Sequence, residues 1–255
     1  MTKVSDRLNR LAESATLAMA RMSRELQAQG HDVIALSLGE PDFDTPDFIK
    51  KAAKKAIDDN FSHYTPVPGL PELRNAISQK FKRDNNLEYT AEQIVTSTGA
   101  KQSLANICLS LLNPGDEVLL PCPYWVSYTE IIKLSEGVPV EVPSNIETDF
   151  KVTPNQLESA ITPRTKLLMF SSPCNPSGTV YTKEELEAIA KMLEKYPDIY
   201  VIADEIYEHI NFTTAHFSIG TIESMKDRTV TVNGVSKGFA MTGWRVGFIG
   251  APLWL

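Results

Sequence analysis

The sequence is poor in cysteine, and its cysteines have no regular spacing. Cys108, Cys122 and Cys174 are the only three in 255 residues, an odd number without a CxxC pair. Such a set indicates neither a disulfide framework nor a zinc knuckle, because both need paired or closely spaced thiols. We therefore expect a protein of the reducing cytoplasm that carries no metal site.

The sequence also lacks an excess of positive charge and long apolar runs. It has 25 Lys and Arg against 32 Asp and Glu, a net charge of −7, whereas nucleic-acid binding depends on clustered cations. No run approaches the roughly 18 apolar residues that cross a membrane. The N-terminus leads into a polar amphipathic stretch, unlike the apolar core of a signal peptide. We expect a soluble protein that binds small molecules, and neither nucleic acid nor membrane.

Hydrophobic residues make up 42% of the chain, which is enough for one substantial core. Near the N-terminus, apolar residues recur at helical spacing from Leu8 to Leu26 and Gly30 follows as a stop, which predicts one amphipathic helix. The next segment, VIALSLG, is predicted to be a strand. Proline near a first helical turn predicts two more helices, through KKAAKKAI after Pro46 and through ELRNAISQKF after Pro71.

The rest of the chain alternates between short apolar runs and helical patterns. The runs are IVTST, EVLLP, KLLMFSS, IYVIADE and TVTVNGVS, and the helical segments include QSLANICLSLL, YTEIIKLSEG and KEELEAIAKMLEK. This alternation is typical of βα units that build a mostly parallel sheet. It predicts an α/β fold with a doubly wound sheet. We place a domain boundary near residue 45, before the two proline-started helices that precede the βα alternation.

Four strand ends carry unusual residues, and in open α/β sheets ligands gather at such ends. The first is TSTGAKQSL, where a strand breaks at Gly99 and a helix begins at once, so that free N–H groups and the positive helix end face an anion such as phosphate. Glycine at such a turn is also ordinary chain geometry. The second is SSPCNPSGTVY, where Asn175 either points its amide over the sheet edge or only forms an Asx turn.

The third strand end, IYVIADEIYEHI, closes on a carboxylate. Asp204 ends the apolar stretch, with Glu205 and Tyr207 beside it. A half-buried carboxylate needs a partner, which is a ligand in one interpretation and a helix N-cap or salt bridge in the other. This segment alone does not decide between the two.

The fourth strand end, NGVSKGFAMTGWRVGF, places a lysine and an arginine in a glycine-rich segment. Ser236 and Lys237 follow the predicted strand, and Arg245 offers a forked donor to a phosphate. A lysine at a strand end is often only a solvated surface residue. From Gly234 to Gly247, however, the string resembles the cofactor-lysine signature of class I and II aminotransferases. These form the aspartate aminotransferase family of fold-type I pyridoxal-phosphate enzymes.

The other segments match the remaining motifs of that family in its order. TGAKQ at 98–102, NPSG at 175–178, DEIY at 204–207 and SLGEPDFDTP at 37–46 match, as do the YTPVPG turn and the PCPYW segment. The resemblance covers essentially the whole chain and is closest to the bacterial aspartate or aromatic aminotransferases. It implies pyridoxal 5′-phosphate as cofactor and transfer of an amino group between an L-amino acid (aspartate, glutamate or aromatic) and a 2-oxo acid.

The resemblance also implies a role for each matching residue. Lys237 would hold the cofactor covalently and then act as general base, while Asp204 would keep the pyridine nitrogen protonated. The catalytic residues are then Lys237, Asp204 and Tyr207, in a homodimer whose subunits share their active sites. The further contacts are Tyr207 and Asn175 to the 3′ oxygen, Trp125 to the ring, Gly99, Ala100, Lys101, Ser236 and Arg245 to the phosphate, Tyr64 to the phosphate of the neighbouring subunit, and Gly39, Trp125 and Asn175 to the substrate.

Members of the family continue past the Arg245 motif into a C-terminal small domain with an arginine for the substrate's α-carboxylate, whereas this sequence stops at Leu255. We expect residues 1–45 to form an N-terminal helix and arm of the small domain, and residues 46–255 to form the cofactor-binding large domain. The sequence is then either a fragment or a natural truncation that binds the cofactor far better than it transaminates. Two alternatives remain, a fold-type I carbon–sulfur β-lyase and a non-catalytic cofactor-binding module.

Overall fold

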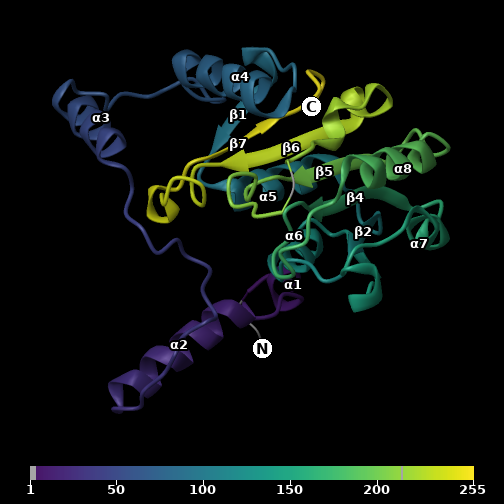
Figure 1. Ribbon diagram of the computed structural model, residues 1–255, viewed down its shortest axis with the longest axis horizontal. Helices are drawn as coiled ribbons and strands as arrows, with labels where there is room; N and C mark the ends of the chain where they lie inside the picture. The colour runs from purple at the N-terminus through teal and green to yellow at the C-terminus, as the bar shows by residue number, and fades with distance from the viewer. Residues whose placement is uncertain (1–3, 214) are drawn as a thin grey trace.

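The computed structural model describes residues 4–213 and 215–255 and is built around one seven-stranded sheet (Figure 1). The strands are β1 Ile94–Ser97, β2 Glu117–Pro121, β3 Val138–Val142, β4 Thr165–Ser171, β5 Tyr200–Asp204, β6 Thr229–Gly234 and β7 Gly247–Gly250. Their order across the sheet is β1-β7-β6-β5-β4-β2-β3. Strand β7 runs antiparallel to both neighbours and the other described pairs are parallel. The predicted mostly parallel α/β fold is confirmed.

The helices begin where local capping signals stand. Helix α8 starts with a capping box between Thr182 and Glu185, and α7 with one between Thr153 and Gln156, while α4 starts on Pro71. The α-helices are α1 Asp6–Asn9, α2 Ala15–Ala28, α3 Asp47–Asp58, α4 Pro71–Asn85, α5 Ala100–Leu111, α6 Ser127–Leu134, α7 Pro154–Ala160 and α8 Lys183–Leu193. Short 3-10 helices are η1 Ala91–Gln93, η2 Ile146–Thr148, η3 Ile219–Thr221, η4 Glu223–Arg228 and η5 Thr242–Trp244.

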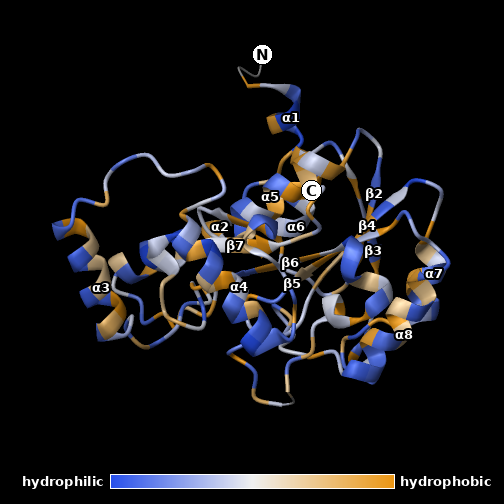
Figure 2. Ribbon diagram, turned by 90° about the horizontal axis from the view of Figure 1, so that it is seen from above, coloured by the Kyte–Doolittle hydropathy of each residue, from blue (hydrophilic) through white to orange (hydrophobic). Residues whose placement is uncertain are grey.

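The central strands are apolar on both sides because both faces of the sheet are covered. Leu168 and Val201 face a core shared with α7 and α8, whereas their neighbours Leu167 and Ile202 face a core shared with α5 and α6. The covering helices are amphipathic, and α8 shows both hydropathy colours in Figure 2. A sheet packed from both sides holds the ends of its strands in fixed positions.

The N-terminal region differs from its prediction in two ways. The expected single helix from Leu8 to Leu26 is two helices, because the Ser14 side chain accepts a hydrogen bond from the Leu17 backbone N–H and caps a new helix there. The predicted strand VIALSLG does not form in the described part of the chain. Its Ile34 is 82% exposed, and an extended segment without a pairing strand is not stable as a sheet element.

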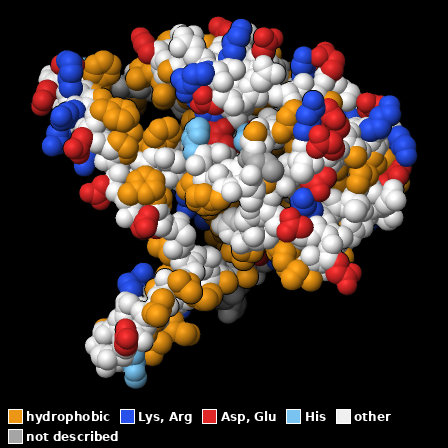
Figure 3. Space-filling model, viewed as in Figure 1, with side chains coloured by type: hydrophobic (Ala, Val, Ile, Leu, Met, Phe, Trp, Pro, Cys, Tyr) orange, Lys and Arg blue, Asp and Glu red, His pale blue; other side chains and the backbone are white. Residues whose placement is uncertain are grey.

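Two N-terminal helices carry exposed apolar side chains. Helix α2 reaches away from the sheet, and an extended segment links it to α3 (Figure 1). Leu17, Met19 and Met22 of α2 are each more than half exposed, and hydrophobic side chains are visible along this helix in Figure 3. Phe48 and Ile57 of α3 are 70% and 76% exposed.

Among the described residues, no helix has both the length and the apolar character that a membrane crossing requires.

Candidate active site

Three neighbouring parallel strands bring the predicted site residues to one edge of the sheet. Ser171 at the end of β4 pairs with Asp204 at the end of β5, and Asp204 pairs with Val232 of β6. The segments that follow β4 and β6 carry Asn175 and Lys237. Because the carboxyl ends of parallel strands meet at one edge, side chains that are distant in the sequence converge there.

Asp204 is a buried carboxylate with two hydrogen-bond donors. The residue is 4% exposed, and its side chain accepts a 2.7 Å hydrogen bond from the Tyr128 hydroxyl and a 3.3 Å bond from the Ile206 backbone N–H. Burial disfavours the charged form and raises the pKa of Asp204 to about 6, although the two hydrogen bonds oppose this effect. At neutral pH the carboxylate is therefore mostly an anion in a poorly solvated position, where a cationic group of a ligand would be stabilised.

Tyr128 is a site residue that the sequence analysis missed. It lies on the apolar face of α6 and is 1% exposed, so its helical spacing marks it only as a core residue. Only its hydroxyl could have indicated more, because the O–H of a buried tyrosine usually donates to a polar partner. Here that partner is Asp204.

Replacing Tyr128 by phenylalanine should raise the pKa of Asp204 further, because the charged carboxylate loses a donor. A hydrogen bond to a charged group contributes about 1.5–3 kcal/mol, which corresponds to roughly one to two pKa units. Titration of the Asp204 carboxyl by carbon NMR measures the change. Tyr124→Phe is the matched control, because the Tyr124 hydroxyl donates to Glu141 instead. Equal Asp204 titration curves in the two variants would contradict the role given to Tyr128.

Asn175, Tyr207 and Lys237 lie next to one another. The Asn175 side-chain amide donates to the Tyr207 hydroxyl at 3.4 Å, and the Lys237 Nζ lies 5.6 Å from the centre of the Tyr207 ring. The Asn175 amide and the Tyr207 hydroxyl can both donate hydrogen bonds. The structure thus brings together three of the predicted residues with complementary chemistry.

The segment before α3 covers the lysine. Lys237 Nζ donates to the backbone carbonyl of Gly39, and the Thr45 hydroxyl donates to the backbone carbonyl of Ala240 at 2.6 Å. Burial lowers the pKa of the Lys237 ammonium, and the carboxylate of Glu40 opposes this shift. Lys237 therefore loses its proton more easily than a solvated lysine does. A neutral amine is the form that acts as a nucleophile or base.

A cation and a helix N-terminus meet at the start of α5. Gly99 has a left-handed φ of 86°, and a Cβ atom at this position would lie 2.1 Å from the Arg245 Nη2. Arg245 Nη1 donates to the Thr242 carbonyl at 2.7 Å, and Nη2 donates to the Thr98 carbonyl at 3.4 Å. The backbone N–H groups of Ala100 and Lys101 have no acceptor within the helix, whereas that of Gln102 donates to the Gly99 carbonyl at 3.0 Å. Together they form a site for an anion such as phosphate.

Lys101, on the first turn of α5, is in contact with Trp125. The Lys101 Nζ is 4.8 Å from the centre of the Trp125 ring, and Trp125 packs edge-on against Tyr128 with ring centres 5.6 Å apart. Burial lowers the pKa of Lys101, and Arg245 acts in the same direction. The stacking of Trp125 on a cofactor ring stays a prediction.

Two further predicted residues lie at opposite extremes of burial. Ser236, directly before Lys237, is 8% exposed. Tyr64 is fully exposed on the segment between α3 and α4, and none of the contacts described above involves it. Its predicted role in a neighbouring subunit's site also stays a prediction.

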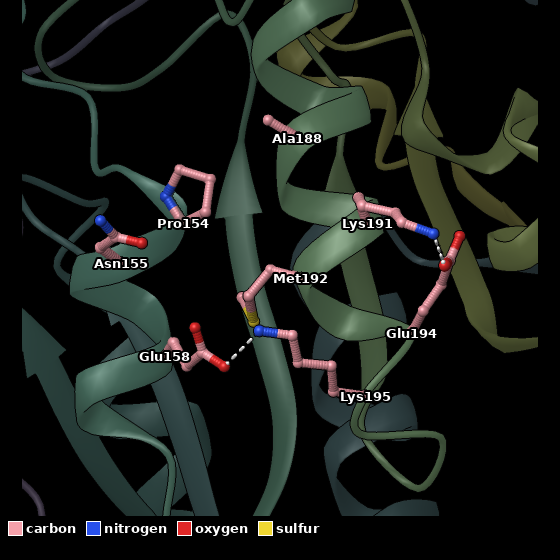
Figure 4. Close-up of a pocket in the computed structure, with 8 residues that line it drawn as sticks. All are labelled: Pro154, Asn155, Glu158, Ala188, Lys191, Met192, Glu194 and Lys195. Carbon is pink, nitrogen blue, oxygen red and sulfur yellow. Dashed lines mark hydrogen bonds and ion pairs between the residues drawn. The ribbon is translucent and has the colours of Figure 1, made fainter.

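A surface depression of about 540 Å³ lies elsewhere, beside α7 and α8 (Figure 4). Its charged side chains are paired with one another, Lys195 with Glu158 at 2.9 Å and Lys191 with Glu194 at 2.6 Å. Its lining contains none of the predicted site residues. We therefore assign the candidate active site to the sheet edge around Asp204.

Comparison with curated proteins agrees with the resemblance in the sequence. The family model for aminotransferase class I and II matches residues 31–254. The aspartate/prephenate aminotransferase of Cereibacter sphaeroides is 51% identical over 255 residues, which cover 99% of this chain and 64% of that protein. The aspartate/prephenate aminotransferase of Nitrosomonas europaea is 48% identical over 252 residues, which cover 98% of this chain and 64% of that protein. This chain thus spans 64% of the length of these relatives.

Solved structures share the fold. The Thermus thermophilus aspartate aminotransferase with maleate has a TM-score of 0.95 and 45% identity, covering 100% of this chain and 66% of that one. The aspartate aminotransferase from Rhizobium meliloti has a TM-score of 0.96 and 40% identity, covering 100% of this chain and 64% of that one. These matches confirm the predicted fold-type I sheet. The chain belongs to the class I and II aminotransferase family.

Proposed function

We propose that the protein is a pyridoxal-phosphate-dependent aminotransferase, which moves an amino group between an L-amino acid and a 2-oxo acid. The observation that carries the proposal is the convergence of Asp204, Tyr207 and Lys237 at one sheet edge, next to an anion site built from Arg245 and α5. The names of the curated relatives favour an aminotransferase over a carbon–sulfur β-lyase or a non-catalytic module, and aspartate is the first donor to test. Glutamate and aromatic amino acids are the next donors.

The residues of the site fit pyridoxal phosphate in chemistry and order. Buried Asp204 offers an anion to the pyridine nitrogen, and Asn175 and Tyr207 offer donors to the 3′ oxygen. Lys237 offers an amine to the aldehyde, and Arg245 offers a cation to the phosphate. When bound, the cofactor supplies an electron sink that makes the substrate's Cα proton removable.

Each residue would then have a defined physical task, and Lys237 would have two. Asp204 would keep the pyridine nitrogen protonated, because a close anion favours the charged form of its partner. Lys237 would bind the aldehyde and would also serve as the base that takes the Cα proton, because its lowered pKa makes the neutral amine easier to form. Arg245, Ser236 and the backbone N–H groups of Ala100 and Lys101 would hold the phosphate and so orient the cofactor in the site.

We also propose the assembly and location that the resemblance implies. In a homodimer, Tyr64 of each subunit would reach the phosphate of the other, and the full exposure of Tyr64 and the exposed apolar side of α2 support this arrangement. Residues 1–45 would form the N-terminal helix and arm of the small domain, and residues 46–255 would form the cofactor-binding large domain, with the boundary in the extended segment before α3. The three described cysteines are free thiols, which fits a cytoplasmic location.

Borohydride reduction of the cofactor-loaded full-length protein should attach the label to Lys237. Peptide mapping of the reduced protein identifies the labelled lysine. The control is Lys101→Ala, a variant of a nearby lysine in which Lys237 should still carry the label. The label on another lysine would contradict the assignment. A protein whose visible absorption does not respond to pyridoxal phosphate would contradict the proposed function. Release of pyruvate from a β-substituted amino acid without a 2-oxo acid acceptor would favour the lyase alternative.

A further inference from the structure

A buried group of charged and polar side chains lies behind the turn that carries Tyr207. We call it the Glu205 cluster. Glu205 and Glu208 are 3% and 9% exposed, and none of the cluster residues is among those that would contact the cofactor. A buried carboxylate requires a partner, so the cluster must be internally paired. Its members are Lys80 and Asn85 of α4, Glu205 and Glu208 of the turn after β5, and His216 of the loop that follows.

The cluster balances two carboxylates with two cationic groups. His216 Nε2 lies 2.9 Å from a Glu205 carboxylate oxygen, and Lys80 forms an ion pair with Glu208. The Asn85 amide donates to Glu208 at 2.5 Å and to Glu205 at 3.4 Å, and so joins the two pairs. Carboxylate and imidazole atoms that lie this close together are also typical of a metal site. Here Lys80 pairs with Glu208 and His216 pairs with Glu205, so we describe the group as an internal network of paired side chains.

The turn that carries Tyr207 is packed between the Glu205 cluster and the segment that carries Lys237. The Glu205 backbone N–H donates to the Val232 carbonyl at 2.9 Å, which ties the start of the turn to β6. On the other side, a Cβ atom at Gly238 would lie 2.9 Å from the His209 ring. A shift of the turn would therefore displace Tyr207 and press on the backbone next to Lys237.

We propose that His216 is a positioning residue, which in its protonated form pairs with Glu205 and holds the turn that presents Asp204 and Tyr207 to the cofactor. This inference rests on the proposed function, because it assigns His216 a task toward the same cofactor site. Asp204 is next to Glu205 in the chain, and the Glu205 charge contributes to raising the pKa of Asp204. A cation on His216 offsets that charge, so the ion pair also affects the electrostatics of the site.

The ion pair gives the turn a defined pH dependence. Burial lowers the pKa of His216, but Glu205 and Glu208 together outweigh it, and the net pKa is raised above the usual 6.5. Because the pKa of His216 is raised in the folded state, the ion pair contributes its full stabilisation at pH values below the unfolded-state pKa. This stabilisation is lost as the pH rises through the folded-state pKa. The charged and titratable groups that face His216 and its partners are Lys80 and Asp84 of α4, Tyr89, and Glu205, Glu208 and His209 of the turn.

The first test measures cofactor affinity in the full-length protein. The dissociation constant for pyridoxal phosphate, followed by visible absorption from about pH 6 to about pH 9, is compared between wild type and His216→Gln. We expect roughly five- to tenfold weaker binding by the variant at low pH, a typical coupling between neighbouring sites, and convergence as His216 loses its proton in the wild type. His31→Gln, an exposed histidine after α2, is the matched control and should follow wild type throughout.

The second test needs neither cofactor nor a stable variant. In cofactor-free wild type, the His216 ring should titrate above 6.5 by NMR, and the backbone signals of Ile206 and Tyr207 should follow the same curve. Titration of His216 at or below its usual pKa would overturn the proposal. Backbone signals of Ile206 and Tyr207 that do not change with the His216 titration would also overturn it. A ratio of dissociation constants that stays constant with pH would also overturn it, because a purely structural role gives that result. Absence of cofactor binding by wild type would instead refute the proposed function, and the titration would still decide the role of His216.

Discussion

Replacing Lys237 by alanine in the full-length protein should abolish transamination and leave the fold intact. The substitution removes the amine that would bind the cofactor covalently and the base that would move the Cα proton. General acid–base catalysis alone contributes roughly 10²- to 10⁴-fold, so the combined loss should be at least about 10⁴-fold. The measurement is the amino-transfer rate from aspartate to a 2-oxo acid, with circular dichroism to verify the fold.

Lys226→Ala is the matched control, because Lys226 pairs with Glu223 on the surface, in η4. Cofactor should still bind to Lys237→Ala without a covalent link, since the anion site at Arg245 and α5 is unchanged. An added small primary amine should restore part of the rate if the missing group is a base. Turnover by Lys237→Ala near the wild-type rate would show that another residue carries this chemistry.

Replacing Asp204 by asparagine should reduce the rate by roughly 10²- to 10³-fold, a typical effect of removing one electrostatic partner from a preorganised site. Asparagine has nearly the same shape and still accepts the Tyr128 hydrogen bond, but it has no charge to hold the pyridine nitrogen proton. The half-reaction with aspartate, followed by visible absorption, measures the effect. Half-reaction rates close to wild type would mean that Asp204 is a structural residue.

Although Asp204→Asn should lower the rate, the cofactor-free variant should be more stable toward unfolding than cofactor-free wild type. The folded-state pKa of about 6 lies above the unfolded value of 3.8, so folded wild type binds more protons between these values and loses stability as pH rises through them. Asparagine removes this dependence, and the variant should be the more stable protein above about pH 6. Thermal unfolding at several pH values measures both effects. An identical pH dependence in the two proteins would contradict the burial of the ionised carboxylate.

The sequence predicted the central strands well and the irregular strands poorly. Strands β4, β5 and β6 are apolar runs that are buried on both faces, so their composition alone marks them. Strand β3 is partly exposed and contains Pro139, and β7 is only Gly247–Gly250 within a glycine-rich motif, so both lack that signal. Their positions depend on pairing with distant strands, which local sequence does not encode.

The candidate site shows the same division between local and long-range information. Asn175, Asp204 and Lys237 stand at strand ends within recognisable motifs, and the parallel sheet brings them together. Tyr128 and His216 carry no motif in their own segments. Their tasks come from contacts with Asp204 and Glu205, which are formed only after the chain has folded.

The antiparallel direction of β7 gives the two sides of the candidate active site different loop-closure entropies. Strands β6 and β7 are neighbours, so the connection between them stays at one sheet edge and holds Lys237 and Arg245 only eight residues apart. Tyr128 and Asp204 meet across a sequence separation of 76 residues. Because the entropy of closing a flexible loop grows with the logarithm of its length, closing the loop between Tyr128 and Asp204 costs about 2 kcal/mol more than closing a loop of eight residues. Burial around Asp204 must offset that difference, whereas the lysine and arginine are brought into proximity by a single local connection.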